Sequence, residues 1–241
     1  MFDSADAITF AHADLATPSG DVRLLPVLER LVPLAGQPAL ALAPGRQLAA
    51  DGGPWPYDQR AVLERQVEAL AAAGLTALVG YELEFGVYLD DGSEPPTPAH
   101  LGPAYSPHAL VAIDGFVADV LRGCAANGLE LGQLHAEYGP AQVEMPLAAT
   151  DPGYFAGAYG FWGVQNQEAP LRYVPGSSFL GEGNANVELK TSDASANPYL
   201  ALAAVLAAGG AGIAEQLELP EPVQSDPGTW SARTAPSSRC R

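Results

Sequence analysis

Two glutamates, Glu82 and Glu84, lie two positions apart in LVGYELEFGVYL (78–89), where most other residues are apolar or aromatic. This stretch predicts a β-strand, and because side chains alternate between the faces of a strand, both carboxylates are expected on the same face. Two like charges this close repel each other, and they cost free energy to remove from water. A bound cation offsets both costs, so the pair indicates a cation site if other segments supply further ligands.

Further ligand atoms occur in two other segments that predict strands. Around the predicted turn Gly139-Pro140 lie His135, Glu137, Gln142 and Glu144, and Glu188 lies in a later strand. Mg²⁺ and Mn²⁺ favour oxygen ligands, and two such ions need several carboxylates on one concave face. Spacing alone leaves a second interpretation open, because an acidic protein also scatters glutamates over solvated faces and a single histidine is more often structural.

The surrounding segments predict strands mixed with helices. Apolar residues at helical spacing predict helices at 61–75, 108–129 and 197–215, with Gly74 near the end of the first and Asn127-Gly128 at the end of the second. Two strands are expected within 129–147 and one within 184–193. Pro198 suits the first turn of the last helix, and the Ser, Asp and Asn residues before it offer capping oxygens. Few short βαβ units are present, so the order favours an α+β fold.

The charge balance excludes several partners. The chain has 241 residues with 28 acidic and 11 basic side chains, a formal net charge of −17. Nucleic acid and anionic membrane surfaces reward clustered Lys and Arg, so neither is expected as the main partner, whereas divalent cations are compatible. No apolar run is long and clean enough to span a bilayer, which indicates a cytoplasmic protein. Lys190 is the single lysine, and no P-loop motif is present.

Three motifs resemble the glutamine synthetase family, and they occur in the family's order. GYELEF (80–85) resembles its G-x-E-x-E-F strand, HAEYGPAQVE (135–144) its H-x-E…G-x-Q-x-E hairpin, and NVELKTSDASANPYLALAAVLAAG (186–209) its R-x-E-x-R…ANPYLA segment. FWGVQNQEAPLR (161–172) resembles the W-G-x-x-N-R…R phosphate-binding stretch. The chain is more similar to the divergent branch that joins glutamate to ammonia or other amines than to the main housekeeping enzymes.

The resemblance implies a fold and a domain plan. Residues 51–225 would form a glutamine synthetase-like catalytic domain, with a curved antiparallel sheet backed by helices and an internal deletion near residue 152. Residues 1–50, which contain the β-like runs AITFAHA and PALALA, would be the remnant of a small N-terminal β-grasp-like domain. Residues 226–241 would be a disordered or frame-shifted tail, because SARTAPSSRCR abandons the family pattern.

The resemblance also implies site roles, cofactors and chemistry. One Mg²⁺ or Mn²⁺ would bind Glu84, Glu137 and Glu144, and the second would bind Glu82 and Glu188 and bridge the phosphates of ATP. Arg172 falls on an arginine that stabilises phosphoryl charge, and Lys190 on a second catalytic cation. The reaction would be a two-step ligation through γ-glutamyl phosphate, in which metals and arginines neutralise charge on the phosphoryl oxygens. The partners would be glutamate, ammonia or a small amine, and copies of the chain in a ring.

The sequence departs from the family pattern at its centre and at single positions. Family members carry a long central stretch after the position of Pro152, including a G-S-G-M-H-x-H loop whose histidine completes the second metal site. Here PLAATDP passes directly into GYFAGAYGFWG. Gln167 replaces a phosphate-contacting arginine, Val27 replaces an aspartate, and Lys190 replaces an arginine, which keeps the charge but loses the bidentate fork.

Three functions therefore compete. The first is an ATP-dependent glutamate–amine ligase, and the second is a truncated, inactive relative that retains partial metal or nucleotide binding. The third is an acidic α+β domain without a site. Three ordered motifs make the third interpretation the weakest, and the absent central stretch keeps the second open.

Overall fold

The computed structural model describes residues 21–147, 162–176, 185–192 and 196–225, which fall into two compact units. The first unit contains Met1–Ala77, Ala125–Gly128 and Asn197–Glu215, and the second contains Leu78–Cys124, Leu129–Ala196 and Gln216–Arg241. The predicted domain boundaries at residues 50 and 225 stay predictions. AITFAHA and the predicted tail, 226–241, lie outside the described residues.

Short antiparallel strands open the first unit. Strand β1 (Arg23–Pro26) pairs with β4 (Gly45–Leu48), and β2 (Val32–Leu34) pairs with β3 (Gln37–Leu42). A single 3-10 turn at Leu28–Arg30 separates β1 from β2. The β-like run PALALA therefore lies almost entirely in β3, which confirms the prediction of β structure there.

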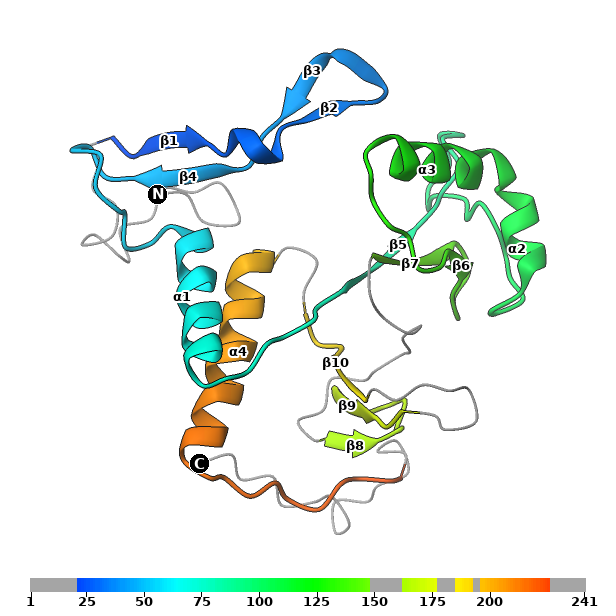
Figure 1. Cartoon of the computed structure of the whole chain (residues 1–241). Coiled ribbons are helices and arrows are strands. Elements are labelled where there is room, and N and C mark those ends of the chain that lie inside the picture. The colour runs from blue at the N-terminus through cyan, green and yellow to red at the C-terminus, as the bar shows by residue number, and fades with distance from the viewer. Residues whose placement is uncertain (1–20, 148–161, 177–184, 193–195, 226–241) are drawn as a thin grey trace. The chain divides into compact units, whose positions relative to one another are not determined.

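Two helices of the first unit, α1 (Gln59–Ala72) and α4 (Pro198–Ala214), pack side by side (Figure 1). The Arg60 guanidinium lies 4.2 Å from the centre of the Tyr199 ring, a cation–π contact between them. Both helices confirm the predictions, as does the capping of α4, where Oδ1 of Asn197 accepts from the backbone N–H of Tyr199 at 3.1 Å. Although α4 is apolar, no helix in the described ranges is long and apolar enough to cross a membrane.

The helix predicted at 108–129 is two helices, which corrects the prediction. Helix α2 (Pro107–Ala112) ends at Ile113, whose φ of −122° and ψ of 29° are not helical, and α3 (Asp114–Ala126) begins immediately afterwards. The Asp114 carboxylate accepts a hydrogen bond from the Gly115 N–H at 2.7 Å, which favours a new helix start over continuation. The apolar spacing runs through both helices, so periodicity alone does not reveal the break. The end at Asn127-Gly128 agrees with the prediction, since Gly128 has a φ of +66°.

The sheet that matters for the site lies in the second unit and has the order β5-β7-β6 (Figure 1). Strands β6 (His135–Ala136) and β7 (Gln142–Leu147) form the predicted hairpin, and β5 (Tyr81–Gly86) pairs with β7 on its other side, all antiparallel. Phe85 on β5 contacts Phe116 on α3 edge to face, with ring centres 6.0 Å apart. Since Phe85 and Glu84 are consecutive in the strand, α3 packs on the face opposite Glu84.

A second three-stranded sheet has the order β10-β9-β8. Strand β10 (Asn186–Leu189) pairs antiparallel with β9 (Leu171–Val174), whereas β8 (Trp162–Val164) pairs with β9 in parallel. The α+β class is confirmed, and the described strands of the second unit divide between two three-stranded sheets. Strands β8 and β9 were not predicted, because their three and four residues are too short to show alternation.

Candidate metal centre

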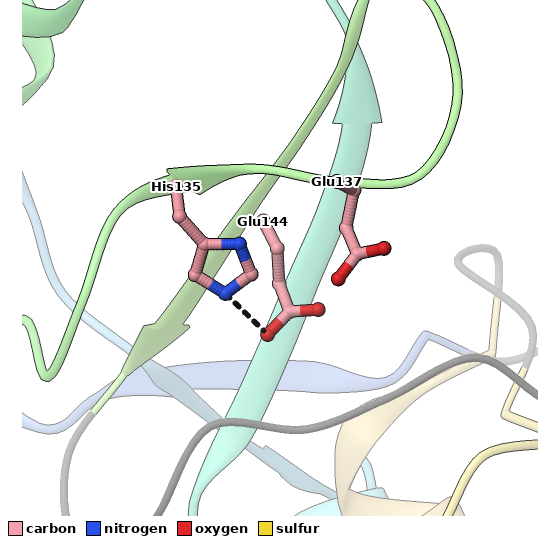
Figure 2. A group of neighbouring side chains, drawn as sticks. All are labelled: His135, Glu137 and Glu144. Atoms are coloured by element: carbon pink, nitrogen blue, oxygen red, sulfur yellow. Dashed lines mark ion pairs between the residues drawn. The ribbon is translucent and has the colours of Figure 1, made fainter. Parts of the chain in front are cut away.

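Three side chains from the β6–β7 hairpin converge on one point. Ligand atoms of His135, Glu137 and Glu144 all lie within 4.8 Å of one another (Figure 2). The register explains this, because Glu144 on the central strand pairs directly with His135 on one side and with Glu84 on the other. Residues directly opposite each other in an antiparallel pair share a face. Glu137 follows β6 two positions after His135 and completes the group.

The two carboxylates of this cluster are buried with few hydrogen-bond partners. Glu144 is 0% exposed and Glu137 is 2% exposed. Both oxygens of Glu144, and Oε1 of Glu137, lack a hydrogen-bond partner among the described residues. Oε2 of Glu137 accepts from the backbone N–H of Tyr138 at 2.8 Å. Buried carboxylates are normally paired or bound to metal, so these three orphaned oxygens indicate a missing cation.

His135 is held in a state suitable for metal binding. Its Nδ1 lies 3.2 Å from the carbonyl oxygen of Ala136, and a carbonyl can only accept, so this hydrogen bond puts the ring proton on Nδ1. The lone pair of Nε2 then points into the cluster, 3.3 Å from Oε1 of Glu144 (Figure 2). A backbone carbonyl that fixes the tautomer in this way is a common partner of metal-binding histidines.

Glu84 lies beside the cluster and is held by Gln142. Nε2 of Gln142 donates to Oε2 of Glu84 at 2.8 Å, while Oε1 of Gln142 accepts from the Gly139 N–H at 2.9 Å. The amide is therefore oriented by the turn, and it fixes the Glu84 carboxylate near Glu144 without placing it among the three converging ligands. Glu84 is exposed, in contrast to Glu137 and Glu144.

Burial and neighbouring charge shift the protonation of Glu144. Removal from water raises the pKa of this carboxyl to about 8, with further contributions from the charge of Glu82 and from Glu137 and Glu84. Without a cation the carboxyl therefore keeps its proton near neutral pH. A divalent ion reverses this balance, because it stabilises the carboxylate form and displaces the proton.

A buried histidine, His100, fixes the hairpin behind the cluster. Nδ1 of His100 accepts from the Gly102 N–H at 3.3 Å, which leaves Nε2 to donate to the Gln142 carbonyl at 3.1 Å. The carbonyl of His100 accepts from the N–H of Ala141 at 2.9 Å, and Ala141 is fully buried with a φ of +64°. These contacts hold a left-handed alanine next to β7 and set the position of Glu144 three residues later. Sequence reasoning missed His100, because its loop carries no periodic pattern.

Three of the remaining predicted residues lie together on the other sheet, whereas Glu82 lies on β5. Arg172 on β9 pairs directly with Glu188 on β10, and Nη1 of Arg172 lies 2.9 Å from Oε2 of Glu188. Nζ of Lys190 lies 3.3 Å from Oε1 of the same carboxylate. Burial lowers the pKa of Lys190, while the charges of Glu188 and Glu82 oppose that effect. Glu82, on β5, thus acts electrostatically on both Glu144 and Lys190.

The residues present fit one divalent ion at the hairpin. Mg²⁺ binds oxygen ligands at about 2.0–2.1 Å, so two ligands of one ion lie about 3–4 Å apart. The three ligand atoms here lie within 4.8 Å of one another, so rotation of the side chains would bring them onto one ion. Imidazole together with carboxylates suits Mn²⁺ better than Mg²⁺, which prefers oxygen throughout.

Comparison with known families identifies the catalytic domain. The profile described as "Glutamine synthetase, catalytic domain" matches residues 56–152 and 150–238, which together make up most of the chain. The chain belongs to the glutamine synthetase family. The match comes as two consecutive pieces that meet where the predicted internal deletion lies.

Curated relatives place the chain within the glutamine synthetase family. It is 29% identical over 312 residues to "Gamma-glutamylpolyamine synthetase GlnA3" of Streptomyces coelicolor, with 88% of this chain and 67% of the relative covered. That alignment is longer than this chain, so it includes residues of the relative that have no counterpart here. "Glutamine synthetase" of Staphylococcus epidermidis is 45% identical over 75 residues, which cover 31% of this chain and 16% of that protein.

Solved structures show the same fold. A structure titled "Crystal structure of novel glutamine synthase homolog" aligns with a TM-score of 0.73 at 23% identity, covering 90% of this chain and 74% of that one. One titled "Apo GmaS without ligand" aligns with a TM-score of 0.66 at 18% identity, covering 88% and 71%. The glutamine synthetase-like fold is therefore shown for this chain.

The W-G-x-x-N motif of this family member has a structural role beside any binding role. The indole N–H of Trp162 donates to the Pro220 carbonyl at 2.8 Å, and Nδ2 of Asn166 donates to the Val223 carbonyl at 2.8 Å. Gly163 lies between these two residues in the sequence and packs against the backbone of Val223. Gln167, which stands where an arginine is expected, is exposed.

Proposed function

We propose that this chain carries the site of an ATP-dependent ligase that joins the γ-carboxylate of glutamate to ammonia or another amine. The observation that supports it most directly is the buried cluster of His135, Glu137 and Glu144, with its orphaned carboxylate oxygens, in a chain of the glutamine synthetase family. These three residues would hold one Mn²⁺ or Mg²⁺. Glu84 lies next to them, held by Gln142, where it would complete the centre or bind a water ligand of the ion.

The proposed chemistry has two balanced steps. An oxygen of the glutamate γ-carboxylate forms a bond to the terminal phosphorus of ATP, and the bond from that phosphorus to ADP breaks. The amine nitrogen then attacks the acyl carbon, phosphate leaves with the former carboxylate oxygen, and the nitrogen loses a proton to give the amide. A metal ion, when bound, supplies charge neutralisation for the phosphoryl oxygens.

Arg172 is the residue of this chain proposed to stabilise the transferred phosphoryl group. Its guanidinium is buried and aligned by Glu188, so it presents a fixed positive charge without reorganisation during the reaction. Lys190, which directly follows β10, contributes a second buried cation that contacts the same Glu188 carboxylate. ATP and glutamate would approach from the face that carries Glu84 and Glu144, because α3 packs on the opposite face of β5.

The test is amide formation measured with high sensitivity. The purified chain is incubated for hours with ATP, Mn²⁺, glutamate and ammonia, methylamine or a polyamine, and the γ-glutamyl amide is detected by mass spectrometry. Polyamines are included because the Streptomyces relative is named for them. Product that requires ATP and Mn²⁺ and disappears in Glu137→Gln supports the proposal.

A second candidate is a relative that has kept the metal centre without turnover. Gln167 in place of an arginine, and an alignment that includes residues absent from this chain, favour this candidate. Mn²⁺ binding to the hairpin together with no amide product would identify it. Absence of Mn²⁺ binding would contradict both candidates.

A further inference from the structure

The second cation position of the site has its own positive charges. Lys190, Glu188 and Arg172 form a buried group in which side-chain exposures are 5%, 15% and 7%. Each oxygen of the Glu188 carboxylate faces one cation, Oε2 the guanidinium at 2.9 Å and Oε1 the ammonium at 3.3 Å. Both partners of Glu188 are thus supplied by the chain itself.

The backbone fixes this arrangement. Glu188 pairs with Arg172 across β9 and β10, so the two side chains leave the sheet on the same face. Lys190 follows Glu188 by two positions, which keeps it on that face, and its N–H donates to the Pro170 carbonyl at 3.0 Å. Backbone pairing at Glu188 and at Lys190 therefore fixes the position of the ammonium beside the carboxylate.

The charges at this position add to neutrality. Glu82 and Glu188 are the two carboxylates predicted for a second metal, and the field of Glu82 reaches Lys190 as well as Glu144. Two carboxylates opposite Arg172 and Lys190 leave no excess negative charge to attract a divalent ion. A metal would have to displace a buried ammonium that is already paired, which costs the pairing energy of both groups.

The cluster of His135, Glu137 and Glu144 has an excess of negative charge. Glu137 and Glu144 are more deeply buried than Glu188, and within the described residues neither forms an ion pair with a lysine or arginine. Their orphaned oxygens need an external cation, whereas Glu188 does not. The two positions therefore differ in what they would accept.

We propose that the ammonium group of Lys190 takes the place of the second metal ion, so that the folded chain binds one divalent cation and not two. A lysine suits this role better than the arginine expected there. Its charge is compact, similar to that of an ion, whereas a guanidinium is a planar fork that spreads its charge. The inference rests on the proposed function, since it concerns the same site.

The number of Mn²⁺ ions bound per chain tests the proposal. Equilibrium dialysis with metal analysis compares the wild-type chain with K190M, which keeps the length of the side chain without its charge. We expect one ion in the wild type and two in K190M. The additional ion should be lost again in the double variant K190M/E188Q. Circular dichroism verifies that each variant is folded.

Two ions in the wild type, or one ion in folded K190M, would overturn the inference while leaving the proposed function intact. No ion in the wild type would overturn the proposed function and this inference together.

A second measurement uses the wild type alone, and it tests whether a metal ion displaces the Lys190 ammonium even if K190M does not fold. Lys190 is the single lysine of the chain, so its acetylation can be quantified by mass spectrometry of one peptide. We expect equally slow acetylation without metal and at saturating Mn²⁺. Acetylation that becomes faster with Mn²⁺ would mean that a metal displaces the ammonium, which contradicts the proposal.

Discussion

At the scale of single residues, the site is defined by which carboxylates have a protein partner. Glu188 has two cations and Glu84 has the amide of Gln142, whereas Glu144 lies beside His135 and the carboxyl group of Glu137. Residue type does not distinguish these glutamates, because every carboxylate can in principle bind a metal ion. Their partners do, and these partners predict different responses to the same substitution.

Glu144→Gln should weaken Mn²⁺ binding much more than Glu188→Gln. Even partners outside the ligand sphere cost about 10–100-fold in metal affinity when they are lost, so a direct ligand should cost at least that much. Glu188 contacts Arg172 and Lys190 instead, so its neutralisation should change the affinity little. Isothermal titration calorimetry of both variants measures the difference, and equal losses would contradict the assignment.

The stability of the metal-free chain should fall as pH rises towards 8. The Glu144 carboxyl has a pKa of about 8 in the fold against 4.5 ordinarily, so the folded state binds more protons between these values. The resulting stabilisation is complete below pH 4.5 and lost above pH 8, with a slope of at most about 1.4 kcal/mol per pH unit for one proton. Urea unfolding at pH 5 and pH 8 measures it.

Glu144→Gln is the control for this pH dependence, because an amide does not titrate in the range. Saturating Mn²⁺ should also remove the decline, since the ion holds the carboxylate form. A decline that persists unchanged in the variant would assign the proton to another group.

At the scale of elements, short irregular segments do as much as long helices to place the site. The His100 loop fixes the hairpin, and the segment at 220–223 is tied to β8 by Trp162 and Asn166. The N–H of Val223 also donates to the Trp162 carbonyl at 2.9 Å. This segment comes within van der Waals distance of Gly163, which explains the glycine without any role in phosphate binding.

Gly163→Ala should destabilise the chain by about 1–3 kcal/mol, as overpacking of a tight contact does. A Cβ at this position would lie 2.6 Å from the Val223 carbonyl and 2.7 Å from Cβ of Asn166, so backbone must shift. Gly123→Ala in α3 is the matched control, since nothing lies within 4 Å of its Cβ. There the alanine should stabilise the helix by about 0.5–1 kcal/mol. Denaturant unfolding measures the change in the free energy of unfolding for both variants, and equal changes would argue against the tight contact at Gly163.

At the scale of the whole molecule, the chain combines a hairpin that keeps the family motif with departures from the family pattern elsewhere in the catalytic domain. The alignment to the Streptomyces relative includes residues that this chain lacks, and Gln167 stands where a cation is expected. Assembly into rings, which the family resemblance implies, and a cytoplasmic location, which the sequence indicates, stay predictions. Light scattering on the purified chain tests the assembly.

The chain by itself should turn over much more slowly than ordinary synthetases. Loss of one group that stabilises developing charge commonly costs about 10²–10³ in rate, and here Gln167 replaces an arginine and Lys190 replaces a bidentate fork. The losses need not multiply, because groups that act together are not additive. Phosphate release from ATP with glutamate and amines, in Mg²⁺ or Mn²⁺, measures the rate. Glutamate-dependent turnover of roughly 1 to 10³ per second, the range of ordinary enzymes, would contradict the prediction.

The sequence by itself determined the family, the α+β class and the hairpin. Motif order and residue spacing carry that information, because strand parity and turn residues are local. Parity predicted that Glu82 and Glu84 share a face, and the turn at Gly139-Pro140 predicted the pairing that brings Glu137 near Glu144.

Only the tertiary structure decided which carboxylates lack a partner. His135 joined Glu137 and Glu144 with its tautomer set by a backbone carbonyl, His100 was hydrogen-bonded to the hairpin, and Glu188 was paired with Arg172 and Lys190. Burial and charge balance depend on residues that are far apart in the chain, and no local pattern records them. The difference between a position that needs a metal ion and one that supplies its own cation is therefore a property of the folded molecule.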